Sequence, residues 1–218
     1  YFLFPMLDGW TNVFQVPGKR TTGTGPQKYA ITGPGWKGTL PEGVTEYKSP
    51  TAIVWLLGRI YCTGTPEDYA AVHQIQDQIS VVPLSAYGKP YTPPAGMVDP
   101  SIDMKTAVRA QVDALSARDY FNLLAQLLKD NPPSADDLPM VEKLAGLGIE
   151  AGKPFDGSKI SPLAKEAFDA VPKIANDRIM AHLKGGILTG DMTLQNGWLF
   201  TTKTGLCGTN YLQRALIT

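Results

Sequence analysis

The run from Asp8 to Gly38 constrains the fold most, because it concentrates turn-forming residues and aromatic side chains. It contains Trp10, the loop Arg20–Gly25 of sequence RTTGTG, and a Gly-Pro-Gly turn before Trp36. Glycine and proline break helices and supply the backbone angles that turns require. The run therefore predicts β segments joined by a shaped loop.

Residues 1–62 as a whole have β character, with turn residues between short aromatic or β-branched runs. The predicted strands are 1–6, 28–32, 43–47 and 51–62. The last of these is the strongest, and its nearly continuous apolar sequence predicts burial on both faces. We then expect Arg59 to be buried beside a carboxylate such as Asp8 or Asp77, because an unpaired buried guanidinium is costly. Gly58 indicates a bulge or a close backbone approach.

A helix is predicted from about residue 66 to 79. Thr65 is a suitable N-cap, and Pro66 fits the first helical position. Apolar residues then recur at helical spacing. A short strand from Ser80 to Ala86 and a proline-rich linker over 88–100 are predicted to follow.

Residues 104–183 are predicted to be mostly helical. Ser116 with Asp119 marks one helix start, and Asp136 or Asp137 caps the next. Ser161 opens a last helical stretch that runs through Leu183 with a kink at Pro172. Residues 187–204 return to β character. The predicted organisation is therefore a β portion with one helix (1–98), an α-helical subdomain (99–184) and a β return segment (185–218).

Composition excludes several classes of function. The 20 acidic and 20 basic residues give no net charge, which argues against a nucleic-acid or anionic-membrane partner. No apolar run is long enough for a transmembrane helix. Two histidines and two cysteines without metal-binding spacing predict no metal and no cofactor. Cys62 and Cys207 could form one bridge or remain two thiols.

Motifs along almost the whole chain resemble a bacterial family of paired domains of unknown function, the domain of unknown function 1254 family. They are WTNV from Trp10, RTTGTG from Arg20, GPGWKG from Gly33, WLLGR from Trp55, LAGLGI from Leu144 and YLQRA from Tyr211. The resemblance implies an exported protein, periplasmic or secreted. It also implies an α+β fold, in which a jelly-roll-like β-sandwich precedes an α-helical subdomain. The sandwich is incomplete here, and the family's second domain is missing. The resemblance assigns no catalytic residues.

Six residues are candidates for ligand binding: Trp10, Arg20, Thr22, Trp36, Arg59 and Asp77. The loop with Arg20 and Thr22 could direct backbone amides at an anion, or it could be a structural turn. Trp10 and Trp36 could form an aromatic platform or pack in the core. Asp77 with His73 could be a general-base pair or part of a solvated helix face.

The sequence leaves open a role as a structural assembly protein and two more specific functions. The first is a non-catalytic protein that binds a small molecule or a glycan and self-associates. The alternative is a hydrolase of glycan or amide bonds that uses acidic residues, such as Asp8, Glu42 and Glu46, in a cleft between β domains. A pocket with two carboxylates beside an aromatic wall would favour the hydrolase. We also expect the aromatic segments 1–4 and 198–200 to need partners, either each other, a second copy or the missing part of the protein.

Overall fold

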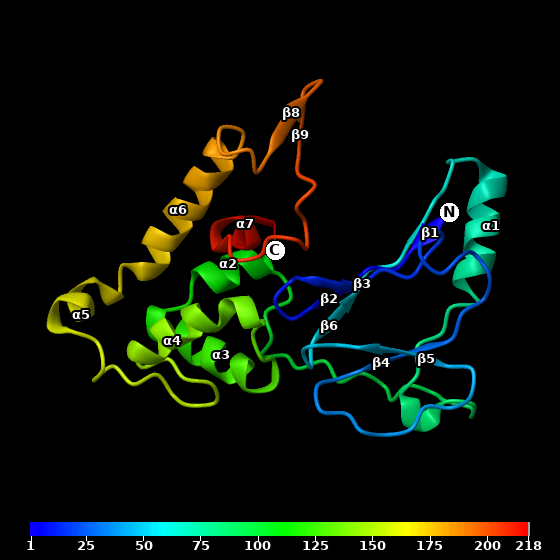
Figure 1. Ribbon diagram of the computed structural model, residues 1–218, viewed down its shortest axis with the longest axis horizontal. Helices are drawn as coiled ribbons and strands as arrows, with labels where there is room; N and C mark the ends of the chain where they lie inside the picture. The colour runs from blue at the N-terminus through cyan, green and yellow to red at the C-terminus, as the bar shows by residue number, and fades with distance from the viewer. Residues whose placement is uncertain (218) are drawn as a thin grey trace.

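The computed structural model describes residues 1–217, which form two lobes (Figure 1). One lobe holds the strands of the first sixty residues together with the first helix, and the other holds the remaining helices. The strands are β1 (Phe2–Leu3), β2 (Met6–Asp8), β3 (Val13–Gln15), β4 (Tyr29–Thr32), β5 (Thr45–Lys48), β6 (Val54–Leu56) and β7 (Arg59–Ile60). The predicted mixture of α and β structure is confirmed.

The strands form small sheets. β3, β2 and β6 make one antiparallel sheet, in which Met6 faces Gln15 on one side and Leu56 on the other. β1 pairs with β7, and β4 pairs in parallel with β5. No closed barrel is present in the part of the chain that the structure describes. The jelly-roll-like sandwich stays a prediction.

The predicted strand 51–62 is divided, and the prediction that it is buried on both faces is wrong. β6 pairs with β2, whereas β7 belongs to a separate two-stranded sheet. Trp55 is 53% exposed. The division falls at Gly58, where an added Cβ would lie 2.6 Å from the Phe4 ring. The predicted close approach at Gly58 is therefore confirmed.

Arg59 is exposed, so its predicted burial beside Asp8 or Asp77 is also wrong. Within residues 1–217 its side chain makes no hydrogen bond or ion pair. The physical reason is that β7 pairs with β1 alone among the strands that the structure describes. The Arg59 guanidinium is therefore not covered by another strand and reaches water. We expect Arg59→Leu to change the free energy of unfolding by no more than about 0.5 kcal/mol in urea titrations. A loss of several kcal/mol would show that Arg59 is paired after all.

The first helix agrees with the sequence, but the segment after it does not. α1 (Pro66–Gln76) begins as predicted, with the Thr65 hydroxyl accepting the Asp68 N–H at 3.3 Å. The predicted strand 80–86 is wrong, because the chain there ends in the 3₁₀ turn η1 (Leu84–Ala86). Pro83 offers no backbone N–H to a neighbouring strand.

The second lobe confirms the predicted helices. They are α2 (Val108–Asp113), α3 (Ala117–Asp130), the 3₁₀ turn η2 (Ala135–Asp137), α4 (Leu138–Gly146), α5 (Pro162–Phe168) and α6 (Val171–Gly185). Ser116 and Ser161 are N-caps, as expected. Pro172 lies in the first turn of α6, so it begins a helix instead of kinking one.

A small aromatic core holds this helical lobe together. Ala125, Ile149 and Phe155 are buried, and Phe121 packs against them. The Phe155 ring stacks on Phe168, with 4.9 Å between the centroids. This packing joins α3, α5 and the loop after α4 into one unit.

The end of the chain combines a predicted and an unpredicted element. β8 (Thr193–Gln195) and β9 (Trp198–Phe200) form the expected β return as a hairpin, which projects from the helical lobe (Figure 1). α7 (Tyr211–Ile217) was not predicted.

The two aromatic segments 1–4 and 198–200 lie in different lobes, at β1 and at β9. Trp198 is 74% exposed and Tyr1 is 49% exposed. Segments 1–4 and 198–200 therefore do not pack against each other, and their association with a second copy or with the missing part of the protein stays a prediction.

Two further sequence questions are answered within the described residues. Cys62 and Cys207 are both free thiols. None of the helices that the structure describes is both long and apolar enough to span a bilayer. The organisation into 1–98, 99–184 and 185–218 stays a prediction, and its last residue lies outside the described part.

Candidate functional site

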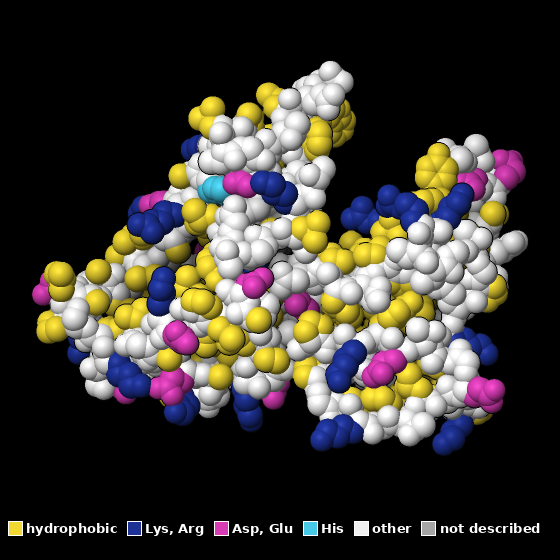
Figure 2. Space-filling model, in the orientation of Figure 1, with side chains coloured by type: hydrophobic (Ala, Val, Ile, Leu, Met, Phe, Trp, Pro, Cys, Tyr) yellow, Lys and Arg dark blue, Asp and Glu magenta, His cyan; other side chains and the backbone are white. Residues whose placement is uncertain are grey.

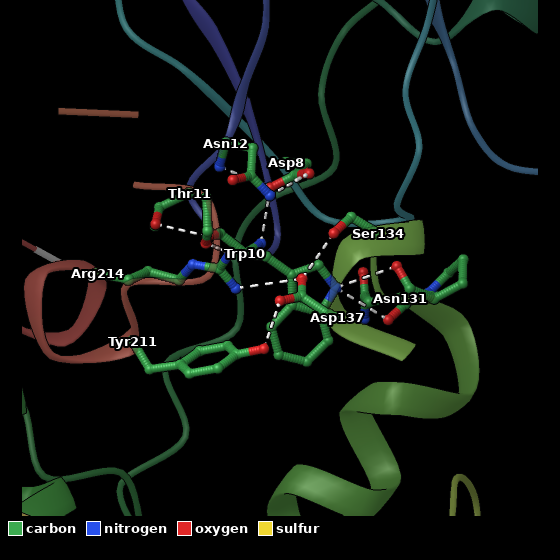
Figure 3. A network of polar contacts seen from close by, with 11 residues as sticks. Asp8, Trp10, Thr11, Asn12, Asn131, Ser134, Asp137, Tyr211 and Arg214 are labelled. Atoms are coloured by element: carbon green, nitrogen blue, oxygen red, sulfur yellow. Dashed lines mark hydrogen bonds and ion pairs between the residues drawn. The ribbon is translucent and has the colours of Figure 1, made fainter. Parts of the chain in front are cut away.

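The turn between β2 and β3 carries Trp10 from the strand lobe to the helical lobe. Asp8 shapes this turn, because its Oδ1 accepts the backbone N–H groups of Trp10 and Asn12, each at 2.9 Å. The Trp10 indole N–H then donates to the carbonyl oxygens of Asn131 at 3.2 Å and Pro132 at 3.1 Å (Figure 3). Trp10 thus connects a strand turn to the end of α3.

Asn131 completes this connection from the other side. Its Oδ1 accepts the Ile53 N–H at 2.9 Å, and its Nδ2 donates to the Leu127 carbonyl at 2.9 Å. The side chain is 5% exposed, so both bonds form away from bulk water. Asn131 therefore fixes the position of the strand lobe against α3.

Asp137 is the centre of a second polar group, which attaches α7 to the helical lobe. Its carboxylate accepts from Ser134 Oγ at 2.8 Å, from the Tyr211 hydroxyl at 3.0 Å and from Arg214 Nη1 at 3.4 Å (Figure 3). Burial opposes ionisation of Asp137, but the three donors together hold its pKa below the usual value. Burial and the bond to Asp137 raise the pKa of Tyr211. The carboxylate is therefore charged at neutral pH.

A third polar group joins α7 to α6. Asp191 accepts from Lys203 at 2.8 Å and from Thr189 at 2.9 Å, and its pKa is lowered chiefly by the Lys203 bond. His182 Nε2 lies 3.4 Å from Asp191 and 3.1 Å from Oε1 of the fully buried Gln213. Together with Asp137, this group holds the first turn of α7, which contains Tyr211, Gln213 and Arg214.

A cavity of about 790 Å³ lies among these helices and is lined by α2, α3, α4, α6, α7 and the Trp10 turn. Most of its wall is apolar or aromatic: Trp10, Val108, Val112, Leu115, Tyr120, Phe121, Leu124, Leu128, Met140, Val141, Leu144, Val171, Pro172, Ala175, Ile179 and Ala215. Figure 2 shows hydrophobic side chains gathered over this lobe. A smaller cleft of about 270 Å³ lies beside Asp8, Asp136 and Arg214.

The cavity wall carries few polar side chains, and they bind one another. Arg109 Nε lies 3.0 Å from both oxygens of Asp113, and its Nη2 donates to Asn176 Oδ1 at 2.8 Å. The other polar members are Thr11, Asp137, Tyr211 and Arg214. Each arginine on the wall therefore has an aspartate partner, which leaves the cavity without net charge from these pairs. Within residues 1–217 no group of three potential metal-ligating side chains occurs.

Of the six residues predicted from the sequence, Trp10 lines this cavity and the other five lie elsewhere in the first lobe. The Arg20–Gly25 loop closes on itself, because the Gly18 carbonyl accepts the N–H groups of Thr21, Thr22 and Gly23 at 2.9–3.1 Å. Those three amides converge on a backbone oxygen where an anion would have to lie. Arg20 instead lies over the Tyr1 ring, 5.7 Å from its centroid.

The other candidates are dispersed over the surface of the strand lobe. Trp36 packs over its own turn, since an added Cβ at Gly38 would lie 2.5 Å from the indole. Asp77 is exposed at the end of α1, next to the equally exposed His73. The structure therefore does not bring Arg20, Thr22, Trp36, Arg59 and Asp77 together with Trp10 into one site.

Sequence reasoning missed the residues that define the cavity's polar groups. Asp137 was expected only as a helix cap, although it makes no side-chain capping bond in α4. Tyr211 and Arg214 belonged to a family motif, but their partner Asp137 lies more than seventy residues away. Arg109 and Asn176 are separated by a similar distance along the chain. No local spacing could indicate such pairs.

Comparison with known proteins confirms the family resemblance over the first lobe. Residues 1–83 match the family model described as "Protein of unknown function (DUF1254)". No curated protein matches the chain. A solved structure, the VPA0106 protein from Vibrio parahaemolyticus, shares the fold with a TM-score of 0.64 at 21% identity. The match covers 99% of this chain and 49% of that one, so the chain spans about half the length of that protein.

Proposed function

We propose that this protein binds a small, largely apolar molecule in the cavity of the helical lobe. The observation that carries the proposal is the cavity itself, at about 790 Å³ and with an apolar wall from five helices and Trp10. Small-molecule sites typically enclose about 300–1,000 Å³, with mostly apolar walls and a few placed polar groups. The cavity has both properties.

The character of the wall favours an apolar ring system over a sugar. Trp10, Tyr120 and Phe121 offer aromatic surface, which suits stacking or edge contacts with a ring. A glycan would need many hydrogen bonds to its hydroxyl groups, and the wall offers few. Of the two ligand classes considered from the sequence, the small molecule is therefore the better supported.

Hydrolysis is the second candidate, because the cavity does contain two carboxylates, Asp113 and Asp137, beside an aromatic wall. A two-carboxylate mechanism needs one group that stays protonated, with a raised pKa. The pKa of Asp137 is lowered, and Asp113 is bound to Arg109. Binding without catalysis thus fits the wall better. Turnover of 4-nitrophenyl glycosides or anilides that is lost in Asp113→Asn would reverse this preference.

Three finer features of the proposal rest on the family resemblance. They are a jelly-roll-like β-sandwich, export to the periplasm or beyond the cell, and self-association or association with a second β domain. The match to about half of the VPA0106 protein of Vibrio parahaemolyticus supports a larger whole. The activity of that whole protein would then involve surfaces beyond this chain.

The test uses the neutral fluorescent probe N-phenyl-1-naphthylamine and a variant that fills the cavity. Ala175 lines the cavity on α6, whereas the preceding Ile174 does not. We expect Ala175→Trp to weaken probe binding by at least about 10-fold, since apolar burial worth about 1.4 kcal/mol or more is lost. Ile174→Trp is the matched control and should bind as the parent does.

Two outcomes would overturn the proposal. The first is an absence of saturable probe binding by the parent protein. The second is equal binding by Ala175→Trp and the parent, which would place the probe on exposed apolar surface such as the β8–β9 hairpin. Circular dichroism on both variants checks that α6 remains folded.

A further inference from the structure

Among the described residues, the Arg109–Asn176 pair is the one polar contact on the cavity wall that links α2 with α6. Arg109 lies between Val108 and Val112, and Asn176 lies on the α6 face that also presents Pro172, Ala175 and Ile179 to the cavity. Residues three and four apart share a helix face. Both polar side chains therefore interrupt apolar stripes that line the same space.

The chemistry of the pair fixes which atoms it can offer to a ligand. A guanidinium only donates hydrogen bonds, so the amide atom that faces Arg109 must be the oxygen of Asn176. Asn176 Nδ2 is then directed away from that bond. Neither Asn176 Nδ2 nor Arg109 Nη1 makes a hydrogen bond to any residue that the structure describes. The pair thus presents two unused donor groups, whereas one lone pair of Asn176 Oδ1 is already taken by Arg109.

The charge of the pair is already balanced. Asp113 binds Arg109 Nε through both carboxylate oxygens at 3.0 Å. An anionic ligand at Arg109 would also meet the Asp113 carboxylate, which repels it. A neutral acceptor, such as a carbonyl oxygen, gains hydrogen bonds without that repulsion.

We infer that the Arg109–Asn176 pair recognises a neutral hydrogen-bond acceptor on the ligand, so that the ligand class is an apolar ring compound with a carbonyl group. This inference rests on the proposed function, because it assigns the polar end of the molecule proposed to bind in the cavity. Asn176 Nδ2 and Arg109 Nη1 are the specificity-determining donors. The apolar wall holds the rest of the molecule.

The experiment compares 1-acetylnaphthalene with 1-ethylnaphthalene, which differ by one carbonyl oxygen, as competitors of N-phenyl-1-naphthylamine. Asn176→Asp keeps an acceptor for Arg109 but removes the Nδ2 donor. We expect it to weaken 1-acetylnaphthalene binding by about 3-fold, because one neutral hydrogen bond is lost at a pair whose arginine side chain is 50% exposed. Binding of 1-ethylnaphthalene and of the probe should stay the same. Asp177→Asn, on the same helix but outside the cavity, is the control.

The outcomes separate this inference from the proposed function. If the parent binds the probe and Ala175→Trp does not, the cavity site stands whatever Asn176 does. If Asn176→Asp weakens the binding of both naphthalenes equally, Asn176 only positions α2, and the inference is overturned. Unchanged binding of both would overturn it as well. Tighter parent binding of 1-naphthoate than of 1-acetylnaphthalene would overturn the neutral ligand class.

Discussion

Asp137→Asn is expected to destabilise the protein by about 3 kcal/mol, because it removes a buried carboxylate that accepts hydrogen bonds from three side chains. Asp137 is 5% exposed and accepts from Ser134, Tyr211 and Arg214. The new amide places donor hydrogens where these donors already point. Since two of the partners lie on α7, that helix should also detach. Urea unfolding measures the stability, and hydrogen exchange of the α7 amides measures the detachment.

Asp136→Asn is the matched control, since Asp136 is the exposed neighbour and makes no side-chain hydrogen bond within residues 1–217. It should change the stability by no more than about 0.5 kcal/mol. Probe binding should fall in Asp137→Asn but not in Asp136→Asn, because Tyr211 and Ala215 form part of the cavity wall. Equal stability of the two variants would refute a structural role for the Asp137 cluster.

Acidification should reproduce the effect of this substitution. The pKa of Asp137 is lower in the folded protein than in the unfolded chain, where it is about 3.9. Its stabilisation is therefore fully present above that value and is lost as the pH falls through the folded-state pKa. We expect the stability difference between the parent and Asp137→Asn to shrink below about pH 4.

Local sequence signals predicted the elements whose causes lie within a few residues. Thr65, Ser116 and Ser161 each begin a helix as expected, because an N-cap acts on an amide three residues away. The hairpin β8–β9 turns at Asn196 and Gly197, which adopt positive φ angles, although only β character was predicted for this segment. Such elements can be read from the sequence without knowledge of their neighbours.

Burial and the site could not be predicted, because both depend on which segments meet in space. The apolar run 51–62 has the composition of a central strand, yet β7 pairs with β1 alone. The cavity depends on contacts such as Arg109 with Asn176 and Tyr211 with Asp137, which join distant helices. Trp10 was a candidate because of its own aromatic side chain, whereas its partner Asn131 lies in the other lobe and could not be identified.

The second large effect is expected from Gly148→Ala, in the turn that follows α4. Gly148 has a φ of +86°, and a Cβ there would lie 2.2 Å from the Asp156 carbonyl oxygen, a backbone atom. The same turn holds Ile149 and Phe155 in the aromatic core. The backbone strain and the collision together should lower the free energy of unfolding by at least about 3 kcal/mol. This corresponds to a melting temperature that is lower by roughly 6–12 °C.

Gly190→Ala separates the collision from the backbone strain at Gly148. Gly190 has a similar φ of +75°, but no atom lies within 4 Å of its added Cβ. Gly190→Ala should therefore lower the free energy of unfolding by about 1–2 kcal/mol, from the left-handed backbone conformation alone. Phe121 and Leu144 pack on the core and also line the cavity, so probe binding should weaken in Gly148→Ala and persist in Gly190→Ala. Equal melting temperatures for the two variants would show that the turn can move away from Asp156, and that the core does not depend on its close approach.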